Sequence, residues 1–177
     1  SGVGARMYSK NKIYDLTGTA TDSVVYGAVF SSAAANQNVT FANNLIGNLF
    51  APAATGSNAI IGIGLLGGPT TSTFNVFYNT VYINNPTSGA GFGSSGISAI
   101  ADATATTSTL NLRNNVIVNT SVASSPGRTV AYRRSAGGAN MLANYASTSN
   151  NNDLYAGTPG PDNLIYSDGT STAQTIG

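Results

Sequence analysis

The 177-residue chain contains no glutamate, histidine, cysteine or tryptophan, and only 7% of its residues are charged. An ordinary soluble domain carries about 25% charged residues. Without glutamate and histidine, the chain lacks most of the side chains that serve as general bases. The lack of cysteine fits both oxidising and reducing compartments and excludes neither. The surface must therefore consist largely of small and amide side chains, which give little protection against self-association.

Long apolar runs and targeting segments are missing as well. No stretch is long enough to cross a membrane, and no secretory signal is visible. We expect neither membrane insertion nor a nucleic-acid partner. The first residues, Ser1-Gly2-Val3-Gly4, do not resemble a natural initiation site, and we expect a processed or internal boundary there.

One sequence unit recurs along the chain at a nearly constant spacing. Its clearest copy is the segment 73–84, in which apolar and polar residues alternate on both sides of a central asparagine. Related units surround four further asparagines, and the full series is Asn11, Asn44, Asn79, Asn115 and Asn152. Successive members are separated by 33, 35, 36 and 37 residues. Such a spacing is typical of a solenoid, in which each repeat forms one coil.

A second strand recurs between these units and carries a small residue at its centre. The small residues that we align are Gly27, Gly62, Ser98 and Ala131. The residues directly before them are Tyr26, Ile61, Ile97 and Val130. Each repeat then contains about three short strands joined by turns, and nothing in it predicts a helix.

A single repeat of this kind cannot bury its own apolar face, but a stack of coils can. In a stack each residue lies about 4.8 Å from its counterpart in the next coil. We therefore predict an all-β parallel β-helix of about five coils, with 33–37 residues per coil, as one domain over residues 1–177. Inward columns of aliphatic side chains should fill the core. The bend asparagines should form a buried structural ladder of hydrogen bonds, as amide side chains do in cross-β structures.

Four arginines fall within one repeat and are the candidate ligand-binding residues: Arg113, Arg128, Arg133 and Arg134. Since one repeat forms one coil, we expect these side chains near one level of the stack. There they could pair with an anionic glycan. The alternative is an outward-facing basic band that meets a neighbouring subunit or only solvent.

The acidic residues are all aspartates: Asp15, Asp22, Asp102, Asp153, Asp162 and Asp168. A glycosidase needs two carboxylates at one bond, and a calcium site needs several around one ion. These aspartates are scattered along the chain, although Asp162 and Asp168 could approach each other. Because aspartate also favours turns, we predict solvated turn residues, with no catalytic residue, no metal site and no cofactor.

Three further motifs carry less information. The segment 62–67 matches the dinucleotide-binding glycine pattern, but Gly68-Pro69-Thr70 opens a turn where that pattern needs a helix. The segment 104–109 is rich in threonine, yet the equivalent segments lack the regular spacing of an ice-binding surface. Asn38 and Asn119 begin glycosylation sequons, which are short enough to arise by chance.

Two of the repeat units resemble those of right-handed parallel β-helix proteins: Asn114-Asn-Val-Ile-Val-Asn119 and Tyr78-Asn-Thr-Val-Tyr-Ile-Asn84. The later stretch 152–170 is similar to large secreted surface proteins of Bacteroidetes-type bacteria, which a separate C-terminal sorting domain exports and anchors. The resemblance implies a right-handed solenoid in a secreted bacterial protein, outside the cell or on its surface. Since no sorting domain is present, we expect a segment of a longer protein.

Function is inferred from the reduced charge, the missing histidine and glutamate, and the lack of a converging polar cluster. We expect a non-catalytic structural module of an extracellular or cell-surface fibre or stalk, whose partners are further copies stacked head to tail. A basic first coil and an acidic last coil favour such stacking. The alternative is a glycan-binding or polysaccharide-lyase-like module that uses the arginines on a polysaccharide.

Overall fold

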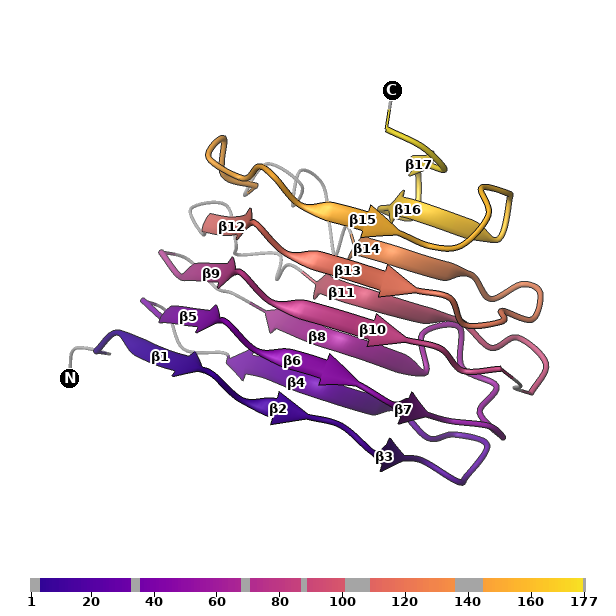
Figure 1. Cartoon of the computed structure of the whole chain (residues 1–177). Coiled ribbons are helices and arrows are strands. Elements are labelled where there is room, and N and C mark those ends of the chain that lie inside the picture. The colour runs from indigo at the N-terminus through magenta and orange to yellow at the C-terminus, as the bar shows by residue number, and fades with distance from the viewer. Residues whose placement is uncertain are drawn as a thin grey trace.

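The computed structural model of the chain describes residues 4–32, 36–67, 71–86, 89–100, 109–135 and 145–176. These residues form strands, turns and irregular connections, and no helix occurs among them (Figure 1). The described part therefore contains no helix that is long and apolar enough to cross a membrane. The predicted all-β class is confirmed.

Each complete coil contributes one strand to each of three parallel sheets. The first sheet contains β1 (Arg6–Ser9), β5 (Asn38–Ala42), β9 (Thr73–Phe77) and β12 (Thr109–Arg113). The second contains β2 (Lys12–Ile13), β6 (Leu45–Gly47), β10 (Thr80–Ile83), β13 (Val116–Asn119) and β15 (Asp153–Tyr155). The third contains β4 (Val25–Ser32), β8 (Ile60–Gly67), β11 (Ser94–Ile100), β14 (Thr129–Ser135), β16 (Asn163–Ser167) and the antiparallel β17 (Thr172–Ala173). A short fourth sheet pairs β3 (Leu16–Thr17) with β7 (Leu49–Phe50).

The chain winds as a right-handed solenoid. It passes along the first and second sheets at the front of Figure 1, returns behind them through the third sheet, and rises by one level with each circuit. The coils number about four, because the last level is incomplete. That level has β15 and β16, but opposite β12 its described residues make only isolated bridges, from Leu110 to Tyr145 and from Arg113 to Asn150.

Alternation along the strands directs aliphatic side chains into the coil. In β10, Val81 and Ile83 are fully buried, whereas Thr80 and Tyr82 face outward. Val81 stacks between Ile46 of the coil below and Ile117 of the coil above, and both are fully buried as well. The predicted aliphatic columns are therefore present, and they stabilise the stack because a single coil could not bury these side chains.

The bend between the first and second sheets is a repeated two-residue turn. Its first residue has a left-handed backbone in every coil, with φ between 52° and 60°, at Lys10, Asn43, Tyr78, Asn114 and Asn151. Its second residue is the ladder asparagine. The left-handed residue turns the chain sharply, so the following side chain points into the stack.

The asparagine ladder is confirmed, and each of its steps has the same geometry. Oδ1 of Asn79 accepts hydrogen bonds from the backbone N of Asn44 at 3.0 Å and from its Nδ2 at 2.9 Å. Nδ2 of Asn79 donates to the backbone oxygen of Phe41 at 2.9 Å and to Oδ1 of Asn115 at 3.1 Å. The same pattern links Asn11 to Asn44 and Asn115 to Asn152. Each buried amide is thus satisfied by the coils next to it.

The predicted alignment of the third-sheet strands is wrong by two residues in one coil. Ser98 pairs with Gly64 and Arg133, and the residue level with Gly62 is Gly96. A Cβ atom on Gly62 would lie 2.4 Å from Val81, and one on Gly96 would lie 2.1 Å from Ile117. The second and third sheets therefore approach each other so closely that this inward column admits only very small residues.

Replacing Asn79 by alanine tests the ladder. The change removes two acceptor and two donor contacts inside the stack and leaves the buried backbone N–H of Asn44 without its acceptor, so we expect a loss of about 1–3 kcal/mol in the free energy of unfolding. Asn75→Ala is the control, because its amide contacts to Thr40 and Asn111 are 3.4 Å long and only partly buried. Denaturant unfolding should show at most about 0.5 kcal/mol for the control. Equal losses in both variants would contradict a stabilising ladder.

The close approach of the two sheets is tested by Gly96→Ala. Its new methyl group would overlap Ile117 and the backbone of Ala131, and we expect a loss of about 1–3 kcal/mol from the strain of overpacking. Gly47→Ala is the matched control, since the nearest atom to its Cβ would be the oxygen of Tyr82 at 3.6 Å. Thermal unfolding should show a lower melting temperature for Gly96→Ala than for Gly47→Ala. An unchanged stability of Gly96→Ala would contradict the close approach of the two sheets at this position.

Candidate functional site

The four candidate arginines do not form a single band. Arg113 lies on β12 of the first sheet, where its guanidinium group stacks 4.5 Å above the ring of Phe77. Arg134 lies on β14 in the column of Leu65 and Ala99, which faces the core, and it is buried. Its guanidinium group lies 5.8 Å from the ring of Tyr145. The alternation of Tyr132 and Arg134 along one strand is the sequence signal that would have predicted an inward Arg134.

Arg128 and Arg133 are the pair that the structure brings together. Nε of Arg133 donates to the Ser95 hydroxyl at 2.7 Å, and Nη2 lies 3.5 Å from the backbone oxygen of Ser57. Burial lowers the pKa of Arg133, and the positive charge of Arg128 lowers it further. The Ser95 hydroxyl in turn donates to Oδ1 of Asn58. These groups form a fixed cationic surface on the third sheet, which suits an anion but contains no base.

Among the described aspartates, Asp15 and Asp168 accept hydrogen bonds from neighbouring groups. Asp15 accepts a hydrogen bond from Nδ2 of Asn48 at 3.1 Å, and Asp153 lies exposed on β15. Asp102 lies outside the described residues. Within the described ranges no three acidic, histidine or cysteine side chains gather closely enough to hold a metal ion.

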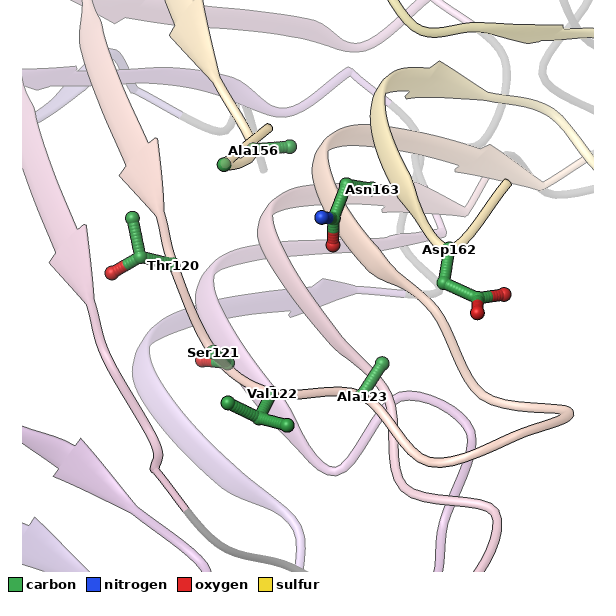
Figure 2. A pocket seen from close by; sticks show the side chains of 8 residues that line it. Thr120, Ser121, Val122, Ala123, Ala156, Asp162 and Asn163 are labelled. Atoms are coloured by element: carbon green, nitrogen blue, oxygen red, sulfur yellow. The ribbon is translucent and has the colours of Figure 1, made fainter. Parts of the chain in front are cut away.

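A hollow of about 250 Å³ lies between the connections 120–123 and 156–163 (Figure 2). The connection 156–162 is two residues shorter than the connection 120–128 in the coil below. The polar groups of the hollow bond mainly within the protein: Asn163 donates to the oxygen of Thr158, and the Ser121 hydroxyl accepts from the backbone of Asn85. Figure 2 shows the Asp162 carboxylate directed away from Thr120, so the hollow offers no pair of convergent catalytic groups.

The sequon and glycine motifs also have structural explanations. Asn119 is fully buried, and its amide donates to the Ser94 hydroxyl and to the oxygen of Val130, whereas Asn38 is exposed on β5. The glycine pattern 62–67 lies within strand β8. Of the threonine-rich segment, only Thr109 belongs to the described residues, where it begins β12.

Comparison with models of known protein families, with curated proteins and with solved structures finds no match. Function must therefore be argued from the two ends of the solenoid and from its surface.

The lower end of the solenoid exposes both strand edges and core side chains. β1, β2, β3 and β4 are terminal strands of their sheets, and all four lie at this end (Figure 1). Ile13, Ala28 and Phe30 are only partly buried here, although they pack on the core. Their counterparts one coil higher, Ile46, Ile63 and Leu65, are at most 4% exposed. The difference leaves a partly apolar hollow of about 390 Å³.

The upper end is closed to a greater extent. The core column of Ile63 and Ile97 ends in the aromatic residues Tyr132 and Tyr166, whose ring centres lie 5.7 Å apart. Burial raises the pKa of Tyr132 far above its usual value. Beyond them, β17 turns back and pairs antiparallel with β16, so part of the upper edge of the third sheet is already occupied.

The carboxylate of Asp168 holds the turn between β16 and β17. Its Oδ1 accepts the backbone N–H groups of Ser171 at 2.6 Å and Thr170 at 2.9 Å, and its Oδ2 accepts the hydroxyl of Tyr166 at 3.0 Å. These bonds favour the charged carboxylate. They lower the pKa of Asp168, with the Ser171 N–H as the largest cause. Gly169 supplies the positive φ of 89° that the turn needs.

The pKa of Asp168 predicts the pH dependence of this turn. Since the pKa is lower in the folded state, the carboxylate contributes its full stability above its unfolded value near 3.8 and loses it as the pH falls through the folded value. Carboxyl-carbon NMR should give a midpoint below 3.8 for Asp168. The unfolding free energy of Asp168→Asn should fall less than that of the wild type upon acidification. A midpoint at or above 3.8 would contradict the hydrogen-bonded turn.

Proposed function

We propose that the chain is a non-catalytic structural module of an extracellular or cell-surface fibre or stalk, and that it lengthens by stacking end to end with further copies. The observation that carries this proposal is the lower end, where the described residues leave four terminal strands and part of the core uncovered. Open strand edges favour pairing with another chain. A contact between two different ends propagates as a filament unless the rotation closes it.

The composition supports the same proposal. A chain with only 7% charged residues has little of the surface repulsion that keeps ordinary domains apart. The similarity of the stretch 152–170 to secreted bacterial surface proteins supports a location outside the cell, and this localisation is part of the proposal. An inert stack of hydrogen-bonded coils suits a spacer, because its length follows from the number of coils.

A glycan-binding function is the second candidate, and the adjacent Arg128 and Arg133 favour it. Two cations on one fixed surface could pair with the carboxylates of a uronic-acid polymer. A screen of such polymers tests both candidates, because binding that is lost in Arg133→Ala would support the glycan-binding function. Unsaturated product detected by ultraviolet absorbance and lost in Arg133→Ala would overturn the non-catalytic proposal.

End-to-end stacking predicts a concentration-dependent size. Sedimentation should show oligomers that grow with protein concentration, and electron microscopy should show unbranched rods. Ile13→Asp should reduce the association at least tenfold, because it would bury a carboxylate without a partner against the next copy. Val122→Asp is the matched control, since Val122 lies exposed on a side connection of the solenoid. An equal effect of both variants would show that association does not use the lower end.

A further inference from the structure

The second sheet carries opposite charges at its two ends in a single column. The pairing register places Lys12, Leu45, Thr80, Val116 and Asp153 directly above one another. Lys12 and Asp153 are the charged members, and both are exposed at the ends of the column. If the upper level of one copy meets the lower level of another in the same register, Asp153 lies opposite Lys12. Opposite charges at directly paired positions stabilise a sheet.

The asparagine ladder is complementary at its ends in the same way. In every internal step the lower asparagine donates with its backbone N and Nδ2 to Oδ1 of the asparagine above it. Asn152 is the highest member, so by this pattern it presents donors upward. Asn11 is the lowest member and presents its Oδ1 downward. A second copy stacked on Asn152 would continue the ladder without a change of geometry.

The third sheet is blocked at its upper edge by the chain itself. Tyr166 pairs with Ala173, and Ser167 pairs with Thr172. The column that begins at Ala28 ends at Tyr166, and the column that begins at Val29 ends at Ser167. In the stacked register, Ala28 and Val29 of the next copy would therefore pair with these same two residues of β16. One strand edge can pair only once. Strand β17 and the β4 strand of a second copy therefore compete for the same hydrogen bonds.

The hairpin of β16 and β17 is small enough to yield in this competition. β17 has two residues, neither of them buried, and is held by the Asp168 turn. A strand of two residues makes few hydrogen bonds and buries little apolar surface, so its opening costs little compared with global unfolding.

We propose that β17 is an internal cap that competes with a second copy of this chain for the upper edge of β16, and that stacking in the Lys12–Asp153 register requires the cap to open. The inference rests on the proposed end-to-end function. It adds the surface that binds the second copy and the segment that regulates access to this surface. The occupant is the lower level of another copy. Its Lys12 matches Asp153, the Oδ1 of its Asn11 matches the donors of Asn152, and its open β4 strand matches the edge of β16.

A reversible disulfide tests the cap. Ser167 and Thr172 are directly opposite each other in the hairpin. The neighbouring pair, Asp168 and Ser171, is hydrogen-bonded from the N–H of Asp168 to the oxygen of Ser171. Because hydrogen-bonded and non-hydrogen-bonded pairs alternate, Ser167 and Thr172 form a non-hydrogen-bonded pair, in which the Cβ atoms lie close enough for a disulfide. The chain has no cysteine of its own. The double variant Ser167→Cys and Thr172→Cys should associate at least tenfold more weakly when oxidised than when reduced. Each single cysteine variant serves as control for the substitution itself.

A second variant opens the cap. Gly169→Ala adds a side chain at a φ of 89°, where no neighbouring atom lies within 4 Å, so its effect is backbone strain alone. We expect association about tenfold tighter than in the wild type. Gly160→Ala is the matched control, because Gly160 is not among the glycines with positive φ and its Cβ would lie 3.9 Å from the nearest oxygen.

Charge reversal tests the register. Lys12→Asp and Asp153→Lys should each weaken association by about tenfold, because each places like charges opposite one another. The double variant should recover it, and a mixture of the two single variants should associate more tightly than either variant alone. Failure of the double variant to recover would overturn the register.

The outcomes separate the inference from the function on which it rests. If the oxidised and reduced cysteine variants associate equally well, the cap is wrong although end-to-end stacking stands. If neither the reduced variant nor Gly169→Ala associates at any concentration, the proposed stacking function fails as well. Sedimentation velocity measures all of these variants, and circular dichroism verifies that each is folded.

Discussion

Hydrogen bonding along the stack is the constraint on which the other features of this protein depend. The ladder asparagine fixes one residue of each coil above its counterpart, with contacts of 2.8–3.2 Å from Asn11 to Asn152. An amide suits this position because it combines an acceptor and two donors without a charge. Once this residue is fixed, every other residue of the coil lies in a column. The aliphatic core and the glycine column then follow from the same register.

The same register explains the rarity of charge. In a column of equivalent residues neighbours lie about 4.8 Å apart, so like charges repeated in every coil would repel along the whole stack. Arg133 accordingly shares its column with Val29, Gly64, Ser98 and Ser167, none of which is charged. Charges of opposite sign occur at the two ends of one column, at Lys12 and Asp153. A low charge content thus follows from the stacked architecture, and it also favours self-association.

The bends could be predicted from the sequence because their chemistry is local: a left-handed residue followed by asparagine recurs in each coil and sets the register of the first and second sheets. The third sheet could not be aligned in the same way. A shift of two residues keeps every side chain on its own face, so the alternation fits Ser98 and Gly96 equally well. The deciding constraint is the clearance between Gly96 and Ile117, which depends on the neighbouring sheet. The separation of Arg113 from Arg133 likewise depends on which sheet each strand joins.

The two ends of a parallel solenoid differ chemically, and this difference determines how an edge can be closed. Another parallel strand requires a whole further coil, whereas an antiparallel return requires only the tight turn at Asp168 and Gly169. A local return therefore covers an edge with few residues and little binding energy. In the proposed assembly, the apparent affinity between copies is the intrinsic affinity multiplied by the fraction of molecules with an open β16 edge. A weak cap thus sets the concentration at which stacking begins and leaves the geometry of the stack unchanged.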